Sequence, residues 1–154
     1  MSITIEKVDR QALSRLIRRG EGHFLDFKSK DIKPSKLTKT LSAFANADGG
    51  ELYIGFDERT AGRFVWNGFE TVEDANGHIQ AIEISFPLSS YFRYTFLSSE
   101  TSKTLILQID IAKTADIRKA ADGIAYLRRG AQSLPQTEAD QIRRLGIFKR
   151  YKQL

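Results

Sequence analysis

Three acidic side chains near the start of the chain have the types and spacing that could support phosphodiester chemistry. Glu21 precedes a short alternating apolar segment, Asp26 lies within it, and Asp57 ends a second such segment. If the two segments pair as strands, the carboxylates of Asp26 and Asp57 can approach each other, and Glu21 can reach the same point from the preceding turn. Converging carboxylates are the ligands that Mg²⁺ and Mn²⁺ prefer, and such a metal can activate a water for phosphodiester cleavage. The pattern therefore predicts a site for Mg²⁺ or Mn²⁺ at Glu21, Asp26 and Asp57.

Lys28 completes the candidate catalytic set. It lies two residues after Asp26 and so on the same face of a strand, where its ammonium group can stabilise charge that develops on a phosphate. A second interpretation stays open. Asp26 and Lys28 can form an exposed ion pair worth well under about 1 kcal/mol, with Glu21 solvated and Asp57 in a turn.

The composition excludes several other classes of site. The 154 residues include no cysteine and two histidines, so a disulfide framework, a cysteine-ligated zinc site and thiol catalysis are ruled out. Neither a GxxxxGK[ST] loop nor a GxGxxG motif is present. No apolar run approaches the ~20 residues that span a bilayer, and the first residues do not read as a secretory signal. We therefore expect a soluble, cytoplasmic chain without a membrane partner.

The positive charge is concentrated at the two ends of the chain. The net charge is +5, with balances of +4 over residues 1–50, −4 over residues 51–114 and +5 over residues 115–154. If the ends meet in the fold, they form one positive face that attracts a polyanion such as nucleic acid; the alternative is an ordinary solvated surface. The candidate nucleic-acid contacts are Arg15, Arg18, Arg19, Lys36, Lys39, Arg128, Arg129 and Arg143.

The first half of the sequence predicts alternating helices and strands. Asp9 is suited to cap a helix that Gly20 ends. Residues 24–28 alternate as a strand, and Pro34 fits the first turn of a second helix. That helix ends by residues 48–50, and residues 51–57 form the next strand.

The second half predicts a short strand at residues 63–66, a helix capped by Thr71, and a hairpin of residues 91–98 and 103–112. Residues 124–128 form a further strand. Thr137 caps a last helix that packs through Ile142, Leu145 and Ile147 or Phe148 and has a basic outer face of Arg143, Arg144, Lys149 and Arg150. Together the elements predict one α+β domain over residues 1–154, with a mixed or antiparallel sheet and helices packed on it.

Several of these segments resemble the Schlafen-type AlbA-like domain family. Glu21-x4-Asp26-Phe27-Lys28 matches its E-x4-E-F-K pattern, and residues 43–50 match A-F-A-N-x-x-G-G. Residues 52–57 resemble its strand ending in I-G-hydrophobic-acid, and residues 126–131 resemble its Y-h-R-x-G segment. The resemblance runs from about Arg15 to Leu145 and includes the closing helix.

This resemblance implies a nucleic-acid-binding α+β lobe. In some Schlafen proteins three acids form a metal-dependent endoribonuclease site that cuts structured RNA such as tRNA, and those acids correspond to Glu21, Asp26 and Asp57. Asp26 departs from the family, which usually has Glu there, and the shorter side chain withdraws the carboxylate by one methylene. Other relatives are DNA-binding regulators or helicase-related ATP-binding proteins. In those the module often leads a longer chain, so this sequence can be an N-terminal domain. A single lobe can also act as a homodimer.

Three functions therefore stay open on the sequence alone. The first is a Mg²⁺- or Mn²⁺-dependent endoribonuclease, and the second is a non-catalytic DNA- or RNA-binding module. The third is a protein-interaction domain in which Tyr91, Phe92 and Tyr94 are exposed anchors. Binding of nucleic acid ranks above nuclease activity, because cleavage also requires a working metal site.

Overall fold

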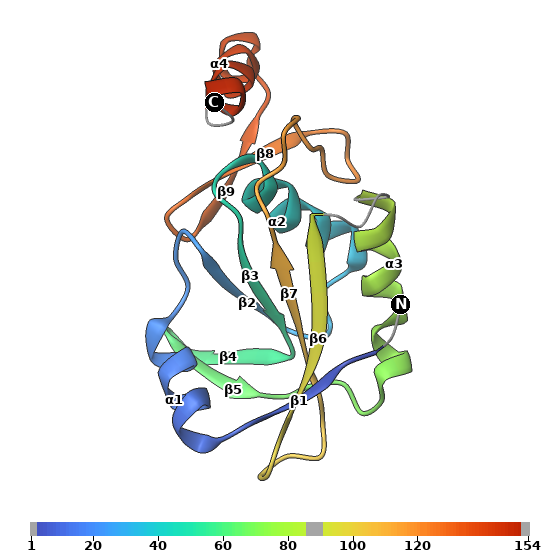
Figure 1. The fold of residues 1–154 in the computed structure, drawn as a ribbon. Helices are drawn as coiled ribbons and strands as arrows, with labels where there is room; N and C mark the ends of the chain where they lie inside the picture. The colour runs from blue at the N-terminus through green and yellow to red at the C-terminus, as the bar shows by residue number, and fades with distance from the viewer. Residues whose placement is uncertain (1–2, 86–90, 152–154) are drawn as a thin grey trace.

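The computed structural model describes residues 3–85 and 91–151 and shows an α+β fold in three layers (Figure 1). A five-stranded mixed sheet with the order β1-β6-β7-β3-β2 forms the middle layer. Its strands are β1 (Ile5–Val8), β2 (Leu25–Lys28), β3 (Gly50–Ile54), β6 (Phe92–Ser99) and β7 (Ile106–Ile111). Within the described residues, no helix is long and apolar enough to cross a membrane.

The pairing of the strands confirms the main sequence predictions. β2 and β3 pair in parallel, with Asp26 opposite Leu52, and β6 and β7 form the expected antiparallel hairpin. β1, which pairs in parallel with β6, was not predicted. Three of its four residues are exposed, so the segment lacks the apolar alternation by which a strand is recognised.

Helices α2 (Pro34–Asn46) and α3 (Asn76–Ser85) cover one face of the sheet (Figure 1). Leu37, Leu41 and Phe44 recur at helical spacing and are fully buried against β3, β6 and β7. α3 follows a short 3₁₀ turn, η1 (Val72–Ala75), for which Thr71 and Asp74 form the predicted N-terminal cap in reciprocal hydrogen bonds.

The other face is covered only in part, by α1 (Arg10–Arg19) and by the small sheet of β4 (Phe56–Thr60) and β5 (Arg63–Trp66). Asp9 caps α1 as predicted, accepting from the amide of Ala12 at 2.7 Å. The predicted strand over residues 51–57 is divided at Gly55, whose φ is +123°. A Cβ there would lie 2.7 Å from Ile106 Cδ1, so only glycine allows the turn at this contact. Asp57 consequently belongs to β4 and not to the strand beside β2.

A second hairpin and the last helix lie at the end of the sheet where α2 stops (Figure 1). The hairpin consists of the predicted β8 (Ala125–Arg129) and of β9 (Gln132–Gln136), which was not predicted. Asn46, fully buried at the end of α2, donates to the carbonyl of Tyr126 at 2.9 Å and to the carbonyl of Arg118 at 2.8 Å. This amide therefore fastens both β8 and the preceding loop to α2.

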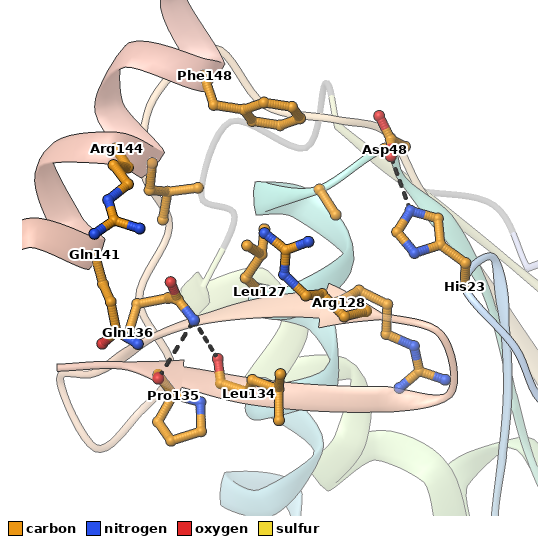
Figure 2. A pocket seen from close by; sticks show the side chains of 13 residues that line it. His23, Asp48, Leu127, Arg128, Leu134, Pro135, Gln136, Gln141, Arg144 and Phe148 are labelled. Atoms are coloured by element: carbon orange, nitrogen blue, oxygen red, sulfur yellow. Dashed lines mark hydrogen bonds and ion pairs between the residues drawn. The ribbon is translucent and has the colours of Figure 1, made fainter. Parts of the chain in front are cut away.

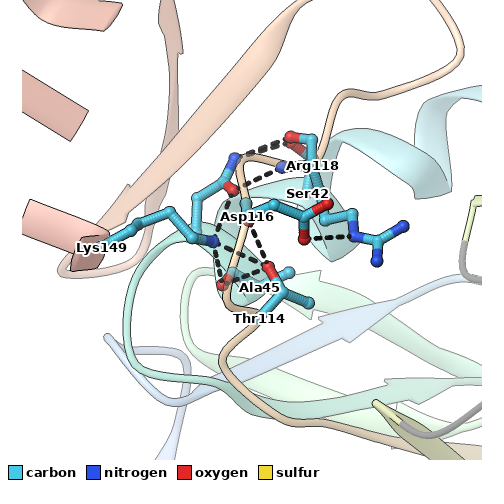
Figure 3. Close-up of polar contacts among 7 residues, drawn as sticks. Ser42, Ala45, Thr114, Asp116, Arg118 and Lys149 are labelled. Carbon is cyan, nitrogen blue, oxygen red and sulfur yellow. Dashed lines mark hydrogen bonds and ion pairs between the residues drawn. The ribbon is translucent and has the colours of Figure 1, made fainter. Parts of the chain in front are cut away.

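Helix α4 (Ala139–Tyr151) differs from its prediction at two side chains, Lys149 and Ile142. Lys149 was expected on the basic outer face, but it is 1% exposed. Its Nζ donates to Thr114 Oγ1 at 2.7 Å and to Asn46 Oδ1 and the Ala45 carbonyl, each at 3.0 Å (Figure 3). Ile142, expected to pack, is 44% exposed. Of the alternatives Ile147 and Phe148, Ile147 is 39% exposed and Phe148 is half-buried. The helix also begins two residues after Thr137, and Gln141 Oε1 accepts from the amides of Thr137 and Glu138.

Two further expectations are corrected by the fold. Phe92 is 4% exposed, and Tyr91 and Tyr94 pack against the core cluster, so these aromatic rings do not form an exposed anchor. The two basic ends of the chain meet only in part, where β8 packs along α2. α1 and α4 lie at opposite ends of the molecule (Figure 1), so their arginines cannot form one continuous face.

Candidate functional site

Asp26 is a buried carboxylate on the α2 side of β2. Its side chain is 2% exposed, with Oδ2 at 3.2 Å from Lys28 Nζ and Oδ1 at 3.6 Å from Arg128 Nη2. The contact with Lys28 is an ion pair without hydrogen-bond geometry, and Asp26 Oδ2 has no hydrogen-bond partner in the described structure. The predicted alternative, an exposed pair of Asp26 and Lys28, is therefore wrong about the exposure of Asp26.

Glu21 lies beside Asp26, against the outer edge of β2. Its Oε2 accepts from the amide of Phe27 at 3.3 Å, which satisfies a donor that an edge strand would otherwise leave to solvent. Partial burial, and next the neighbouring Asp26, raise the pKa of Glu21 to about 7, although the Phe27 amide and Lys28 act in the opposite direction. A carboxyl group with such a pKa can exchange a proton at neutral pH.

Asp57 lies at the start of β4 and accepts from Asn67 Nδ2 at 2.7 Å. It lines a cavity of about 560 Å³ together with Glu21 and Lys28. Asp26 does not line this cavity. The structure thus brings Glu21 to Asp26, and it brings Glu21, Lys28 and Asp57 to one cavity, but it does not gather all three acids at one point.

The donor set does not fit a three-carboxylate metal site in this arrangement. In the described part of the chain, no group of three or more aspartate, glutamate, histidine or cysteine side chains could hold a metal ion. Asp26, the residue that is one methylene shorter than its family counterpart, is engaged by Lys28 and Arg128. Binding of Mg²⁺ or Mn²⁺ stays a prediction.

Arg128 has a structural position rather than a surface one. It is 2% exposed, and its Nε and Nη2 donate to the carbonyl of Gly22 at 3.1 and 3.0 Å. Nη2 also donates to the carbonyl of Leu25 at 3.2 Å, and Nη1 donates to Ser133 Oγ at 3.1 Å. The guanidinium carbon lies 4.8 Å from the centre of the Phe44 ring. Contrary to the expectation, its guanidinium group is occupied by these contacts within the domain.

The other predicted basic contacts divide among three places. Arg15, Arg18 and Arg19 are on α1, where Arg19 Nη1 lies 3.5 Å from Glu51 Oε2. Arg143 is on α4 and forms an ion pair with Asp140 at 3.1 Å. The remaining three are on α2 and the neighbouring hairpin: Lys36, Lys39 and Arg129.

Lys36, Lys39 and Arg129 define what we call the α2–hairpin surface. β8 is fixed along α2 by the amide of Tyr126, which donates to Ser42 Oγ at 3.0 Å, and Lys39 Nζ lies 5.8 Å from the centre of the Tyr126 ring. Lys36 and Arg129 are exposed. The partly covered face of the main sheet differs, because it carries Glu51 and Asp110 as cross-strand neighbours. Burial, together with Glu51, raises the pKa of Asp110 above its usual range.

Sequence reasoning missed two polar features near this surface. His23 Nε2 lies 2.8 Å from Asp48 Oδ2, across the gap between the start of β2 and the end of α2. Nothing in the spacing of these residues indicates the contact. The burial of Lys149 did have a signal, because it follows the buried Leu145 by four residues and so lies on the same face of α4.

Comparison with solved structures shows the same fold elsewhere. The DIP2311 protein from Corynebacterium diphtheriae superposes with a TM-score of 0.58 at 19% sequence identity, covering 77% of this chain. The matched part is 23% of that chain, so this chain spans about a quarter of the length of that protein. No curated protein matches the chain in sequence.

The family comparison covers the acid site, α2 and the hairpin together. Residues 21–137 match the family described as Schlafen, AlbA_2. The matched region includes Glu21, Asp26 and Asp57 and ends before α4, and it suggests a nucleic-acid-binding domain. This chain belongs to the Schlafen AlbA_2 family.

Proposed function

We propose that the chain binds the sugar–phosphate backbone of a nucleic acid through the α2–hairpin surface. The observation that carries the proposal is the placement of Lys36, Lys39 and Arg129 on two elements that the structure fixes side by side. No ion pair in the described structure involves any of the three. Their charge is therefore free to attract phosphates, which supply most of the affinity of sequence-independent binding.

The charge of the opposite face favours this choice of surface. Glu51 and Asp110 lie on the partly covered face of the sheet, where they would repel a polyanion. The arginines of α1 are near that face, and one of them, Arg19, already pairs with Glu51. The α2–hairpin surface is the better docking surface because none of its three cations forms an ion pair in the described structure, although the nearby Asp122 carboxylate has its pKa lowered by a hydrogen bond from a tyrosine hydroxyl and also by Lys39.

A second candidate function is endoribonuclease activity at the acid site. It is supported by the cavity that Glu21, Lys28 and Asp57 share and by the position of a carboxyl group with a pKa near 7 beside a lysine. It ranks second because Asp26 is buried between two cations and lies outside that cavity. A DNA-binding module of a regulator or of a helicase-related protein would use the same basic surface and would not need the acidic residues.

The binding proposal is tested by fluorescence anisotropy with labelled tRNA, a single-stranded RNA and a DNA duplex. The double variant Lys36→Glu/Lys39→Glu should lose most of the affinity of the wild type. Arg93→Glu is the matched control, because Arg93 is exposed on β6 and pairs only loosely with Asp110, at 3.9 Å. Equal losses in both variants, or no binding by the wild type, would refute the proposed surface.

The nuclease candidate requires a separate assay. Purified wild type and Asp57→Ala are incubated with tRNA and Mn²⁺, and the products are resolved on a denaturing gel. Cutting by the wild type alone would support the acid site. Equal cutting by both proteins, or none by either, would rule it out without affecting the binding proposal.

A further inference from the structure

A cavity lies between α4 and the β8–β9 hairpin, away from the acid site. It has a volume of about 710 Å³, within the roughly 300–1,000 Å³ of typical ligand pockets. Figure 2 shows Arg144 and Phe148 reaching into it from α4, with the His23–Asp48 pair on the far side. The hairpin residues Leu127 and Leu134 line the side between them.

The walls of this cavity are fixed by buried contacts. α4 is held by Lys149, whose Nζ makes three hydrogen bonds to the body of the domain (Figure 3), and by Leu145, which is 3% exposed. The hairpin is held by Arg128, which binds the carbonyls of Gly22 and Leu25. A cavity with such walls is formed before a ligand arrives, which lowers the entropic cost of binding.

The charge of the lining favours an anion. Arg129 and Arg144 both line the cavity, and neither forms an ion pair with any residue in the described ranges. The lining includes one carboxylate, that of Asp48, and it is paired with His23 Nε2 at 2.8 Å. Arginine binds a phosphate through two parallel hydrogen bonds, so these two guanidinium groups suit a phosphate at the mouth of the cavity.

The rest of the lining favours a flat, partly apolar group beside the phosphate. Leu127, Leu134, Leu145 and Phe148 supply apolar surface, and Gln141 supplies an amide. Phe24 stacks edge-on against His23 with ring centres 4.8 Å apart, and it is 53% exposed. An exposed aromatic ring next to a basic cavity is a surface on which a nucleobase can stack.

We propose that this cavity binds one nucleotide unit that carries a terminal phosphate, with the phosphate at Arg129 and Arg144 and the base against Phe148 and the leucines. The inference rests on the proposed nucleic-acid binding and adds a preference for ends. The ligand can be a free mononucleotide or the phosphorylated end of a strand, since both present the same chemistry.

The first test is calorimetric titration of the wild type with AMP and with adenosine. AMP should bind about tenfold or more tightly than adenosine, because the phosphate gains charge-assisted hydrogen bonds. Arg144→Ala should remove that difference, while Arg93→Ala should keep it, because Arg93 is exposed and does not line the cavity. Equal binding of AMP and adenosine, or binding of neither at millimolar concentration, would overturn the proposal.

The second test distinguishes the two sources of the ligand and the two proposals. A 12-nucleotide RNA is compared with a 5′-phosphate, with a 3′-phosphate and with hydroxyl ends. Tighter binding of one phosphorylated form, lost in Arg144→Ala, supports an end-binding site; a preference confined to AMP supports a mononucleotide site. Equal binding of all three RNAs, with no preference for AMP, contradicts the site but leaves the α2–hairpin surface intact. RNA binding by the Lys36→Glu/Lys39→Glu variant tests the α2–hairpin surface separately from the cavity.

Discussion

Asp26 and Arg128 face each other in the interior, with Oδ1 and Nη2 3.6 Å apart and each side chain 2% exposed. One residue comes from the acidic motif and the other from the arginine-containing segment near residue 128. The two were expected to act on substrate and phosphate. Their contact instead joins β2 to the hairpin, so both motifs have a structural part in this chain.

Arg128→Ala should lower the free energy of unfolding by about 3–5 kcal/mol, because it leaves the Asp26 carboxylate without its buried partner. Arg129→Ala is the matched control at the next residue, and since Arg129 is exposed its effect should stay within about 0.5 kcal/mol. Urea denaturation measures both. Similar stability of the two variants would show that the buried pair is not formed.

The pKa of Glu21 should be near 7, and ¹³C NMR of its side-chain carboxyl carbon reports it directly. Asp26→Asn should lower this pKa, because a neighbouring carboxylate contributes to the shift after burial. A pKa near 4.5 in the wild type would contradict the placement of Glu21.

The same shift sets the pH dependence of stability. The folded pKa of Glu21 is raised above its ordinary value of 4.5, so the folded state holds the proton more tightly. Its stabilising contribution is complete below about pH 4.5 and is lost as the pH rises through 7. Glu21→Gln should therefore show a smaller loss of stability than the wild type between pH 5 and 7.5 in thermal unfolding. Parallel pH profiles of the wild type and Glu21→Gln would contradict the raised pKa of Glu21.

Lys149 should make the free energy of unfolding change with pH in the opposite direction, at higher pH. Burial lowers its pKa from 10.5 to about 8, so between these values the unfolded chain binds more protons and stability rises with pH. Relative to Lys149→Met, the wild type should gain stability from pH 7.5 to 9.5. A constant difference between the two proteins would indicate that Lys149 is solvated, and with it that α4 is not docked as described.

Substitutions at Gly49 and Gly62 distinguish the cost of a steric contact from the cost of backbone strain. Both have a positive φ, +81° and +77°, but a Cβ on Gly49 would lie 2.6 Å from the Ile111 carbonyl oxygen, whereas Gly62 has open space. Gly62→Ala should cost roughly 1–2 kcal/mol from strain alone. Gly49→Ala should cost about 1–3 kcal/mol more, as measured by urea denaturation. Equal costs would mean that β7 does not approach the end of α2.

The sequence predicted elements and neighbours better than side-chain partners. Local spacing predicted three features correctly: the alternation in β2 and β3, the cap at Asp9 and the β6–β7 hairpin. Which basic segments share a face could not be predicted, since net charge says nothing of where helices dock. β9 was also missed, since Pro135 weakens its pattern.

The candidate site was predicted only in part. Glu21, Lys28 and Asp57 do line one cavity, but Asp57 reaches it from β4 and not from the strand that pairs with β2. The burial of Asp26 and Arg128 was not readable, because their carbonyl and carboxylate partners are about 100 residues apart in the chain. The cavity beside α4 was missed for the same reason, since its lining comes from four separate segments.

The salt dependence of RNA binding tests the central claim most directly. For a single-stranded RNA, each phosphate contact adds about −0.7 to the slope of log affinity against log salt concentration. Lys36→Ala/Lys39→Ala should reduce the steepness of the wild-type slope by about 1.4, while Arg93→Ala should keep it. A wild-type slope near zero, or one that the double variant leaves unchanged, would contradict binding through the α2–hairpin surface.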